Sequence, residues 1–190
     1  MKLLRTLALL PLAAAASQAA TIEFQFGKNN PVGNSHELVE TKYNSGTLTG
    51  ITVAGNLNRN FELGLNVNYK HLATDAVTGV VGSSNLGVLN ASLDLTYDLN
   101  PRGGISPFAG IGLGYAWLSN LYDSTGIPVT TSKGLFTASA FVGVRFAINN
   151  KLDFTLTARD THYIGLNNPT DGTKSNIQNW EAIAGLRYRF

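Results

Sequence analysis

A two-residue alternation of apolar and polar side chains is the feature that most constrains this chain. From Phe61 to Lys70 the odd positions are apolar, and the even positions are polar or glycine. Successive side chains of a β-strand point to opposite faces, so this run places its apolar side chains on one face of an extended strand. An amphipathic helix would need a repeat near 3.6 residues. The pattern therefore predicts β-structure.

The same alternation recurs along the chain, separated by connections of two kinds. It predicts further strands at 88–99, 105–117, 135–148, 152–161 and 180–190, with weaker ones at 21–28 and 47–57. Short turns rich in Asn, Gly and Pro lie at 58–60, 100–104 and 149–151, and long polar loops at 29–46, 72–85, 118–133 and 164–176. Short turns at one end and long loops at the other are typical of an eight-stranded antiparallel up-and-down transmembrane β-barrel.

A soluble β-sandwich also alternates, but two features favour a bilayer. The runs are roughly 10 to 13 residues long, enough to cross a bilayer when tilted, whereas sandwich strands average about 5 to 6. The aromatic side chains also gather at the two ends of the strands, around an aliphatic middle, as two membrane interfaces would select. One group is Phe24, Phe61, Tyr97, Phe146, Tyr188 and Phe190, and the other is Tyr69, Tyr115, Trp117, Phe136 and Trp180.

Composition excludes several other classes of function. The chain has no cysteine, which rules out disulfides, thiolate metal sites and cysteine nucleophiles. Its formal charge of +2 comes from Lys2 and Arg5, so the rest is neutral and shows no basic footprint for nucleic acid. The glycine run from Gly110 to Gly114 continues as a strand and does not match a nucleotide-binding loop. We expect no cofactor and no metal site.

The first residues have the pattern of a secretory signal peptide. Lys2 and Arg5 form a basic start, an apolar stretch covers 7–16, and Ser17-Gln18-Ala19 is a small-x-small cleavage site. We expect a signal peptide at 1–19 and one barrel domain at 20–190. With the N-terminus in the periplasm, the short turns would be periplasmic and the long loops extracellular.

Charged side chains fall on the face opposite the apolar one, which would be the lumen. This face is predicted to carry Glu23, Glu62, Lys70, Asp94, Asp98, Arg145, Asp153, Arg159, Glu181, Arg187 and Arg189. Charges confined in a narrow interior must pair or stay hydrated, and side chains can fill an eight-stranded barrel. We therefore expect an ion-paired polar plug. A second reading, in which Glu62, Lys70, Arg145 and Arg159 line a narrow pore for ions or small solutes, stays open.

The chain resembles the OmpA-like or opacity-type family of small outer-membrane barrels. The resemblance rests on the ending Gly185-Leu186-Arg187-Tyr188-Arg189-Phe190 and on the stretch from Pro107 to Tyr115, and it covers the whole chain after the signal peptide. It implies a bacterial outer-membrane location and contact with lipid and lipopolysaccharide. It also implies that Tyr188 and Phe190 form the signal read by the barrel assembly machinery, with periplasmic chaperones as further partners. Because the chain stops at the last predicted strand, the family's peptidoglycan-binding domain and its wall tethering are not expected.

A second stretch, from Arg159 to Gly172, is similar to the active-site region of lipid A 3-O-deacylase barrels. That family uses a His-x-Ser pair, and here the position two after His162 is Ile164. The region of the family's glutamate reads Thr173-Lys174-Ser175. A serine hydrolase cannot acylate without a nucleophile in reach of its base, so hydrolysis is the weakest expectation.

The sequence thus predicts a non-enzymatic, monomeric barrel with an envelope or surface-interaction role. Loops on a rigid scaffold commonly carry recognition, so an extracellular ligand would meet the long loops. The longest, 29–46, contains His36, Glu37, Glu40 and Lys42.

Overall fold

The computed structural model describes residues 21–32, 43–74, 85–101, 103–118, 134–167 and 174–190. The predicted signal peptide, and His36, Glu37, Glu40 and Lys42 of the first long loop, lie outside these ranges. The described residues form eight strands: β1 (Thr21–Val32), β2 (Tyr43–Asn56), β3 (Phe61–Thr74), β4 (Asn85–Asp98), β5 (Ile105–Leu118), β6 (Gly134–Ala147), β7 (Leu152–Asn167) and β8 (Lys174–Arg189).

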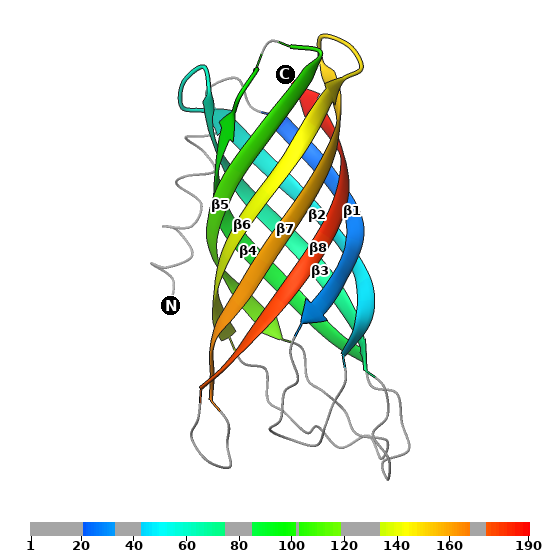
Figure 1. Cartoon of the computed structure of the whole chain (residues 1–190), viewed down its shortest axis with the longest axis vertical. Helices are drawn as coiled ribbons and strands as arrows, with labels where there is room; N and C mark the ends of the chain where they lie inside the picture. The colour runs from blue at the N-terminus through cyan, green and yellow to red at the C-terminus, as the bar shows by residue number, and fades with distance from the viewer. Residues whose placement is uncertain (1–20, 33–42, 75–84, 102, 119–133, 168–173) are drawn as a thin grey trace.

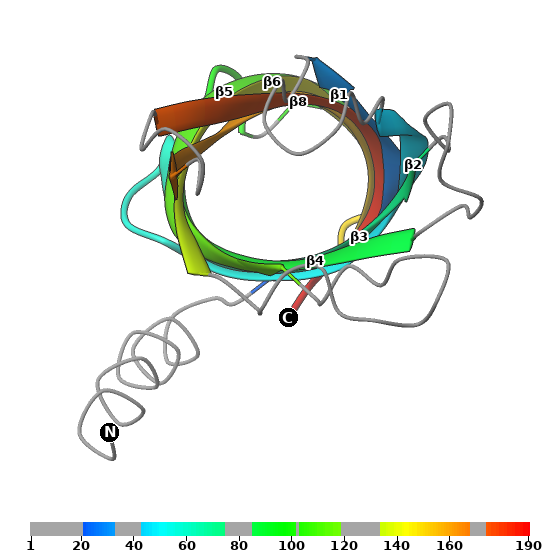
Figure 2. The same cartoon turned by 90° about the horizontal axis from the view of Figure 1, so that it is seen from below.

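The eight strands pair with their sequence neighbours and close into one antiparallel barrel (Figures 1 and 2). The closing seam joins β1 to β8, from Thr21↔Arg189 to Val32↔Gln178. When the paired residues are followed once around the ring from Thr21, the path returns at Pro31, ten residues further along β1. This stagger tilts the strands across the barrel wall, as closure of a twisted sheet requires. The predicted fold class is confirmed.

The strands extend further into the long-loop regions than the alternation predicted. β1 continues to Val32, β3 to Thr74 and β7 to Asn167, while β2 already begins at Tyr43 and β8 at Lys174. The predicted loop boundaries were therefore wrong at this end. Ladder hydrogen bonds use only the backbone, so strands can continue where the outer face no longer needs apolar side chains.

Two of the short turns share one local device. In the β2–β3 turn the Asn58 side-chain oxygen accepts hydrogen bonds from the backbone N–H groups of Asn60 and Phe61, both at 2.9 Å. In the β6–β7 turn the Asn149 oxygen accepts from Lys151 at 2.8 Å and Leu152 at 2.9 Å. An asparagine that bonds the backbone two and three residues ahead fixes a tight reversal. These turns hold the register of the hairpins that carry the lumen charges.

The two faces of the barrel wall have opposite chemistry. Leu113, Ile111, Val142 and Phe26 are each about 60% exposed on the outside or more, as expected of side chains that meet lipid. Aromatic rings contact one another at both ends of the wall: Phe61–Tyr97, Phe146–Phe154 and Tyr188–Phe190 at the short-turn end, and Tyr115–Trp117 and Tyr115–Phe136 at the long-loop end. The polar face is turned inward, so the buried interior of this protein is mainly a polar lumen.

Candidate functional site

The structure places all eleven predicted charged side chains on the lumen side of the wall. They come from six strands: Glu23 (β1), Glu62 and Lys70 (β3), Asp94 and Asp98 (β4), Arg145 (β6), Asp153 and Arg159 (β7), and Glu181, Arg187 and Arg189 (β8). Most are buried, and Lys70 is only 1% exposed. Their contacts divide into three layers along the barrel axis and one pair at the mouth.

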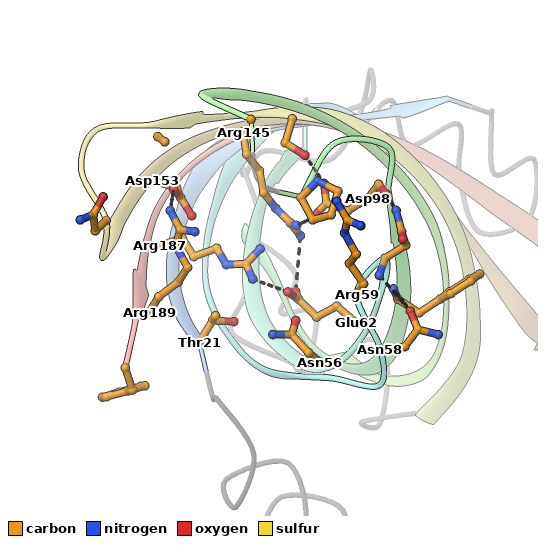
Figure 3. Close-up of a pocket in the computed structure, with 18 residues that line it drawn as sticks. Thr21, Asn56, Asn58, Arg59, Glu62, Asp98, Arg145, Asp153, Arg187 and Arg189 are labelled. Atoms are coloured by element: carbon orange, nitrogen blue, oxygen red, sulfur yellow. Dashed lines mark hydrogen bonds and ion pairs between the residues drawn. The ribbon is translucent and has the colours of Figure 1, made fainter.

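The short-turn layer consists of Glu62, Asp98, Arg145 and Arg187. Glu62 accepts a charge-assisted hydrogen bond from Arg187 and lies 3.4 Å from Arg145 Nη2. Arg145 also pairs with Asp98, which accepts a further hydrogen bond from the Ser106 hydroxyl. Figure 3 shows Arg145 and Arg187 converging on Glu62 from the far walls. Because the four residues stand on β3, β4, β6 and β8, this layer bridges the lumen.

A cavity of about 460 Å³ lies outside this layer, at the short-turn mouth. Its lining includes the short-turn layer, the turn residues Asn58 and Arg59, and a pair in which Arg189 Nη2 lies 2.6 Å from Asp153 Oδ1 (Figure 3). The Arg189 side chain is 36% exposed, in contrast to the deeper charges. The mouth is thus open to solvent, and the short-turn layer forms part of the cavity wall.

The middle layer is the pair between Asp94 on β4 and Arg159 on β7. Asp94 also accepts a hydrogen bond from the Ser92 hydroxyl at 2.8 Å. Glu23 lies in the lumen as well, but its hydrogen-bond partners among the described residues are neutral. It accepts from Thr155 Oγ1 at 2.9 Å and from Gln25 Nε2 at 3.1 Å.

The long-loop layer consists of Lys70, Tyr163 and Glu181. The Lys70 ammonium pairs with Glu181 and donates to the Tyr163 hydroxyl at 2.9 Å. Glu181 also accepts hydrogen bonds from Thr161 and Asn179, both at 3.0 Å. All three of these partners contact Glu181 Oε1, and among the described residues Oε2 has no hydrogen-bond partner.

Two phenylalanines in the lumen were missed by the sequence analysis. Phe141 on β6 pairs with Gly110 on β5, and Phe108 on β5 pairs with Gly143 on β6. A side chain at either glycine would collide with the opposing ring, so each phenylalanine covers the backbone of its glycine partner. The guanidinium carbons of Arg145 and Arg159 lie 4.6 Å from the ring centroids of Phe108 and Phe141. Parity along the strands carried this signal, since both residues fall on the polar face.

The long-loop end of the lumen is more apolar than the predicted polar plug. Leu48, Val88, Ala116 and Leu135 are buried on the inner face at the long-loop end, where Leu48 and Val88 are the strand partners of Lys70. Val88 and Leu135 have the same parity as the charged lumen residues of their strands, Asp94 and Asp98 on β4 and Arg145 on β6. Here the inner face changes from polar to apolar along single strands, so the chemistry of the lumen is not uniform.

His162 and Asp160 lie on the outer wall of β7 and not in the lumen. Their side chains are 3.1 Å apart, and Asp160 also accepts from Gln178 Nε2 at 3.0 Å. Ile164 stands two positions further on the same outward face and is 48% exposed. Within the described part of the chain, no group of three or more His, Asp or Glu residues is placed to hold a metal ion.

The two aromatic residues of the predicted assembly signal lie at the short-turn end. Tyr188 and Phe190 face outward with ring centroids 5.3 Å apart, and Phe190 is 72% exposed. None of the described residues forms a helix long and apolar enough to cross a membrane.

Comparison with known families identifies the fold. Residues 6–190 match the family described as the outer membrane protein beta-barrel domain. The chain belongs to this family. Its outer-membrane barrel fold places the protein in the bacterial outer membrane, and the predicted resemblance to small eight-stranded outer-membrane barrels is confirmed.

Solved members of the outer-membrane barrel class have the same architecture at low sequence identity. Neisserial surface protein A superposes with a TM-score of 0.64 at 14% identity, covering 90% of this chain and 97% of its own. OprG from Pseudomonas aeruginosa gives 0.63 at 14% identity, covering 91% and 96%. E. coli outer membrane protein W gives 0.52 at 15% identity, covering 91% and 98%. These likenesses show the fold alone. No curated protein matches the sequence significantly.

Proposed function

We propose that this protein is a closed, non-enzymatic scaffold of the outer membrane, whose lumen does not conduct and whose long loops carry its interactions. The observation that supports the proposal most directly is the stacking of three charged layers along the lumen. Each layer joins strands that are at least three positions apart around the ring, so each one crosses the interior.

The layers resist opening because their charged groups are buried and have little access to solvent in place of their partners. Lys70 and Glu181 have side chains that are 1% and 0% exposed, and Arg159 and Asp94 are 4% and 5% exposed. Removing one partner of a buried pair costs about 3 to 5 kcal/mol, because the other charge is left buried and unpaired. A conducting path would have to separate or rehydrate the pairs of all three layers in series.

The residue two positions after His162 supports a non-enzymatic role. Asp160 could orient the imidazole, but Ile164 occupies the position that a His-x-Ser pair would give to serine. An imidazole base contributes to acyl transfer only when a nucleophile lies within hydrogen-bond reach.

The further partners that we propose are lipid and lipopolysaccharide, the barrel assembly machinery and an extracellular ligand, with the barrel working as a monomer.

A narrow pore is the second candidate, and the cavity of about 460 Å³ at the short-turn mouth favours it. This cavity would serve as a vestibule if the short-turn layer rearranged. The charged residues that line it would then select the ion.

Single-channel recording in a planar bilayer decides between the two. The mature protein is refolded and its insertion shown by protease protection of the strands. We expect inserted protein to be electrically silent in 0.1 to 1 M salt. Discrete openings whose size follows the salt concentration would overturn the closed scaffold and support the pore.

A further inference from the structure

The lipid-facing wall has a hollow over β6, β7, β8 and β1, which lie side by side at the front of Figure 1. It is a shallow hollow of about 580 Å³ that is wide open to the outside. The hollow is outside the lumen, so it is separate from the charged layers described above.

The strand register explains why the wall is hollow at this place. Two rows of paired residues cross the four strands: Lys28↔Ala182↔Ala158↔Val142 and, nearer the short turns, Phe26↔Ala184↔Leu156↔Val144. Three alanines form the floor, while larger side chains such as Phe26, Leu156 and Val142 rise around them. Many other outward positions carry leucine, isoleucine or aromatic side chains.

One edge of the hollow is charged, which is unusual on a lipid-facing wall. Lys28 is exposed, faces outward from β1 and lines the hollow. No residue within the described ranges forms an ion pair with it. A lysine on the lipid face of a barrel costs about 2 to 4 kcal/mol at mid-bilayer and little near an interface, where its long side chain can reach the headgroups.

The row beyond Lys28, toward the long loops, is polar and aromatic. It contains Asn30, Trp180 and Asp160, paired across β1, β8 and β7, and Asp160 is bonded to His162 and Gln178. The hollow therefore has an apolar floor with polar groups only on its long-loop side. This is the polarity of a membrane lipid whose headgroup lies toward the long loops.

We propose that this hollow binds an acyl chain of an anionic glycolipid of the outer leaflet, with a phosphate of its headgroup held by Lys28. The long loops are taken as extracellular, as the sequence predicts. Lipid tails are as apolar as leucine, so the alanine floor alone gives little preference in a bilayer. The preference comes from the Lys28–phosphate contact and from hydrogen bonds between the glycolipid headgroup and Asp160, His162 and Gln178.

The two tryptophans of the chain provide a built-in probe and a built-in control. Trp180 borders the hollow, whereas Trp117 lies on β5 and pairs with Leu89 and Gly134. In the variant Trp117→Phe all indole fluorescence comes from beside the hollow. In Trp180→Phe it comes from a wall region outside the hollow.

The experiment uses each single-tryptophan protein in phosphatidylcholine bilayers with brominated acyl chains, which quench indole fluorescence on contact. Unbrominated bisphosphorylated lipid A is added in increasing mole fraction. We expect Trp180 to recover fluorescence at a lower mole fraction than Trp117, because lipid A displaces brominated lipid from the hollow first. Equal recovery at the two tryptophans would overturn the proposal.

Substitutions then separate headgroup from acyl chain. Lys28→Gln is expected to raise the mole fraction of lipid A needed at Trp180 about fivefold, which corresponds to about 1 kcal/mol for one lysine near an anionic surface. Lys151→Gln, in the β6–β7 turn, is the charge control and should have no effect. Ala184→Leu should fill the hollow and abolish the preference, whereas Ala91→Leu on the outward face of β4 should leave it intact.

Other lipids and a second copy of the chain are tested in the same assay. Phosphatidylglycerol and dephosphorylated lipid A should each bind less well than bisphosphorylated lipid A. Equal recovery with phosphatidylglycerol would overturn the glycolipid assignment. Recovery that follows the protein-to-lipid ratio, and not lipid A, would mean that another barrel fills the hollow. Neither outcome of the lipid A assay affects the conductance test of the closed lumen, because the hollow and the lumen are on opposite faces of the wall.

Discussion

The ammonium of Lys70 donates a hydrogen bond to the hydroxyl of Tyr163, at 2.9 Å, across the full width of the barrel. Lys70 stands on β3 and Tyr163 on β7, which are four strands apart in both directions around the ring. The same ammonium pairs with Glu181 on β8. One side chain thus ties together walls that no backbone ladder joins directly.

This contact predicts a large loss of stability when Lys70 is neutralised. Lys70→Met leaves Glu181 buried without its cation, and we expect the free energy of unfolding to fall by about 3 to 5 kcal/mol. Tyr163→Phe removes one neutral acceptor and should cost about 1 kcal/mol. Urea titration of the barrel in lipid vesicles, followed by tryptophan emission, measures both. Lys151→Met in an exposed turn is the control. If Lys70→Met lowers the free energy of unfolding no more than Tyr163→Phe does, the stabilising role of the Lys70–Glu181 pair is contradicted.

The contact between Phe141 and Gly110 predicts that one added methyl group at position 110 destabilises the barrel. In Gly110→Ala the new methyl would meet the Phe141 ring and the Leu95 carbonyl oxygen. Overpacking of this kind costs about 1 to 3 kcal/mol. Gly104→Ala has nothing within 4 Å of the added atom and should change stability by less than about 0.5 kcal/mol. The same urea titration compares them, and equal effects of the two substitutions would show that the ring does not hold its place.

Layers in series predict that single lumen substitutions do not open the barrel. Arg145→Ala breaks only the short-turn layer and Arg159→Ala only the middle layer, so in each variant two layers remain. We expect both variants to be as silent as the parent in planar bilayers. Either variant conducting would instead assign the gate to the layer it breaks, and would favour the pore.

The outward pair of His162 and Asp160 predicts no acyl-chain hydrolysis. Lipid A extracted from cells that express the protein should keep all its acyl chains when analysed by mass spectrometry. The same spectrum is expected for His162→Ala. Suppose that lipid A lacks one 3-O-linked acyl chain in cells with the parent protein but keeps it in cells with His162→Ala. That result would establish the hydrolase activity that the sequence disfavours.

The exposed position of Phe190 predicts that its substitution affects assembly in cells more than the stability of the folded barrel. Its ring is 72% exposed and contacts only Tyr188 among the described aromatic rings, so Phe190→Ser should lower the stability of the refolded barrel by about 1 kcal/mol at most. If the last residues are read by the assembly machinery, the same variant should accumulate poorly in the outer membrane of cells. Gel mobility with and without heating measures the folded fraction in both settings. Normal accumulation in cells would remove the assembly role.

The number of alternating runs was enough to predict the eight strands, and parity assigned each charge to one face, because a strand has only two faces. It could not predict partners. Lys70 and Tyr163 come together only through the closure of the ring, which a single strand does not encode. The Phe108 and Phe141 positions were encoded by parity but were overlooked, because an aromatic residue on a polar face breaks the simple pattern. The strand ends at the long loops were missed, since no lipid boundary marks them in the sequence.

The β1–β8 seam has a consequence for how the protein is made. The seam pairs Thr21 with Arg189. The free edge of β1 and the free edge of β8 therefore stay unpaired until both strands are present. Contacts that join the two ends of a chain are slow to form, because a long loop must close before the pairing rewards it. Until synthesis has delivered β8, seven strands would expose two open edges able to pair with other chains. Folding is therefore an event of the completed polypeptide, and a chain truncated within β8 should aggregate.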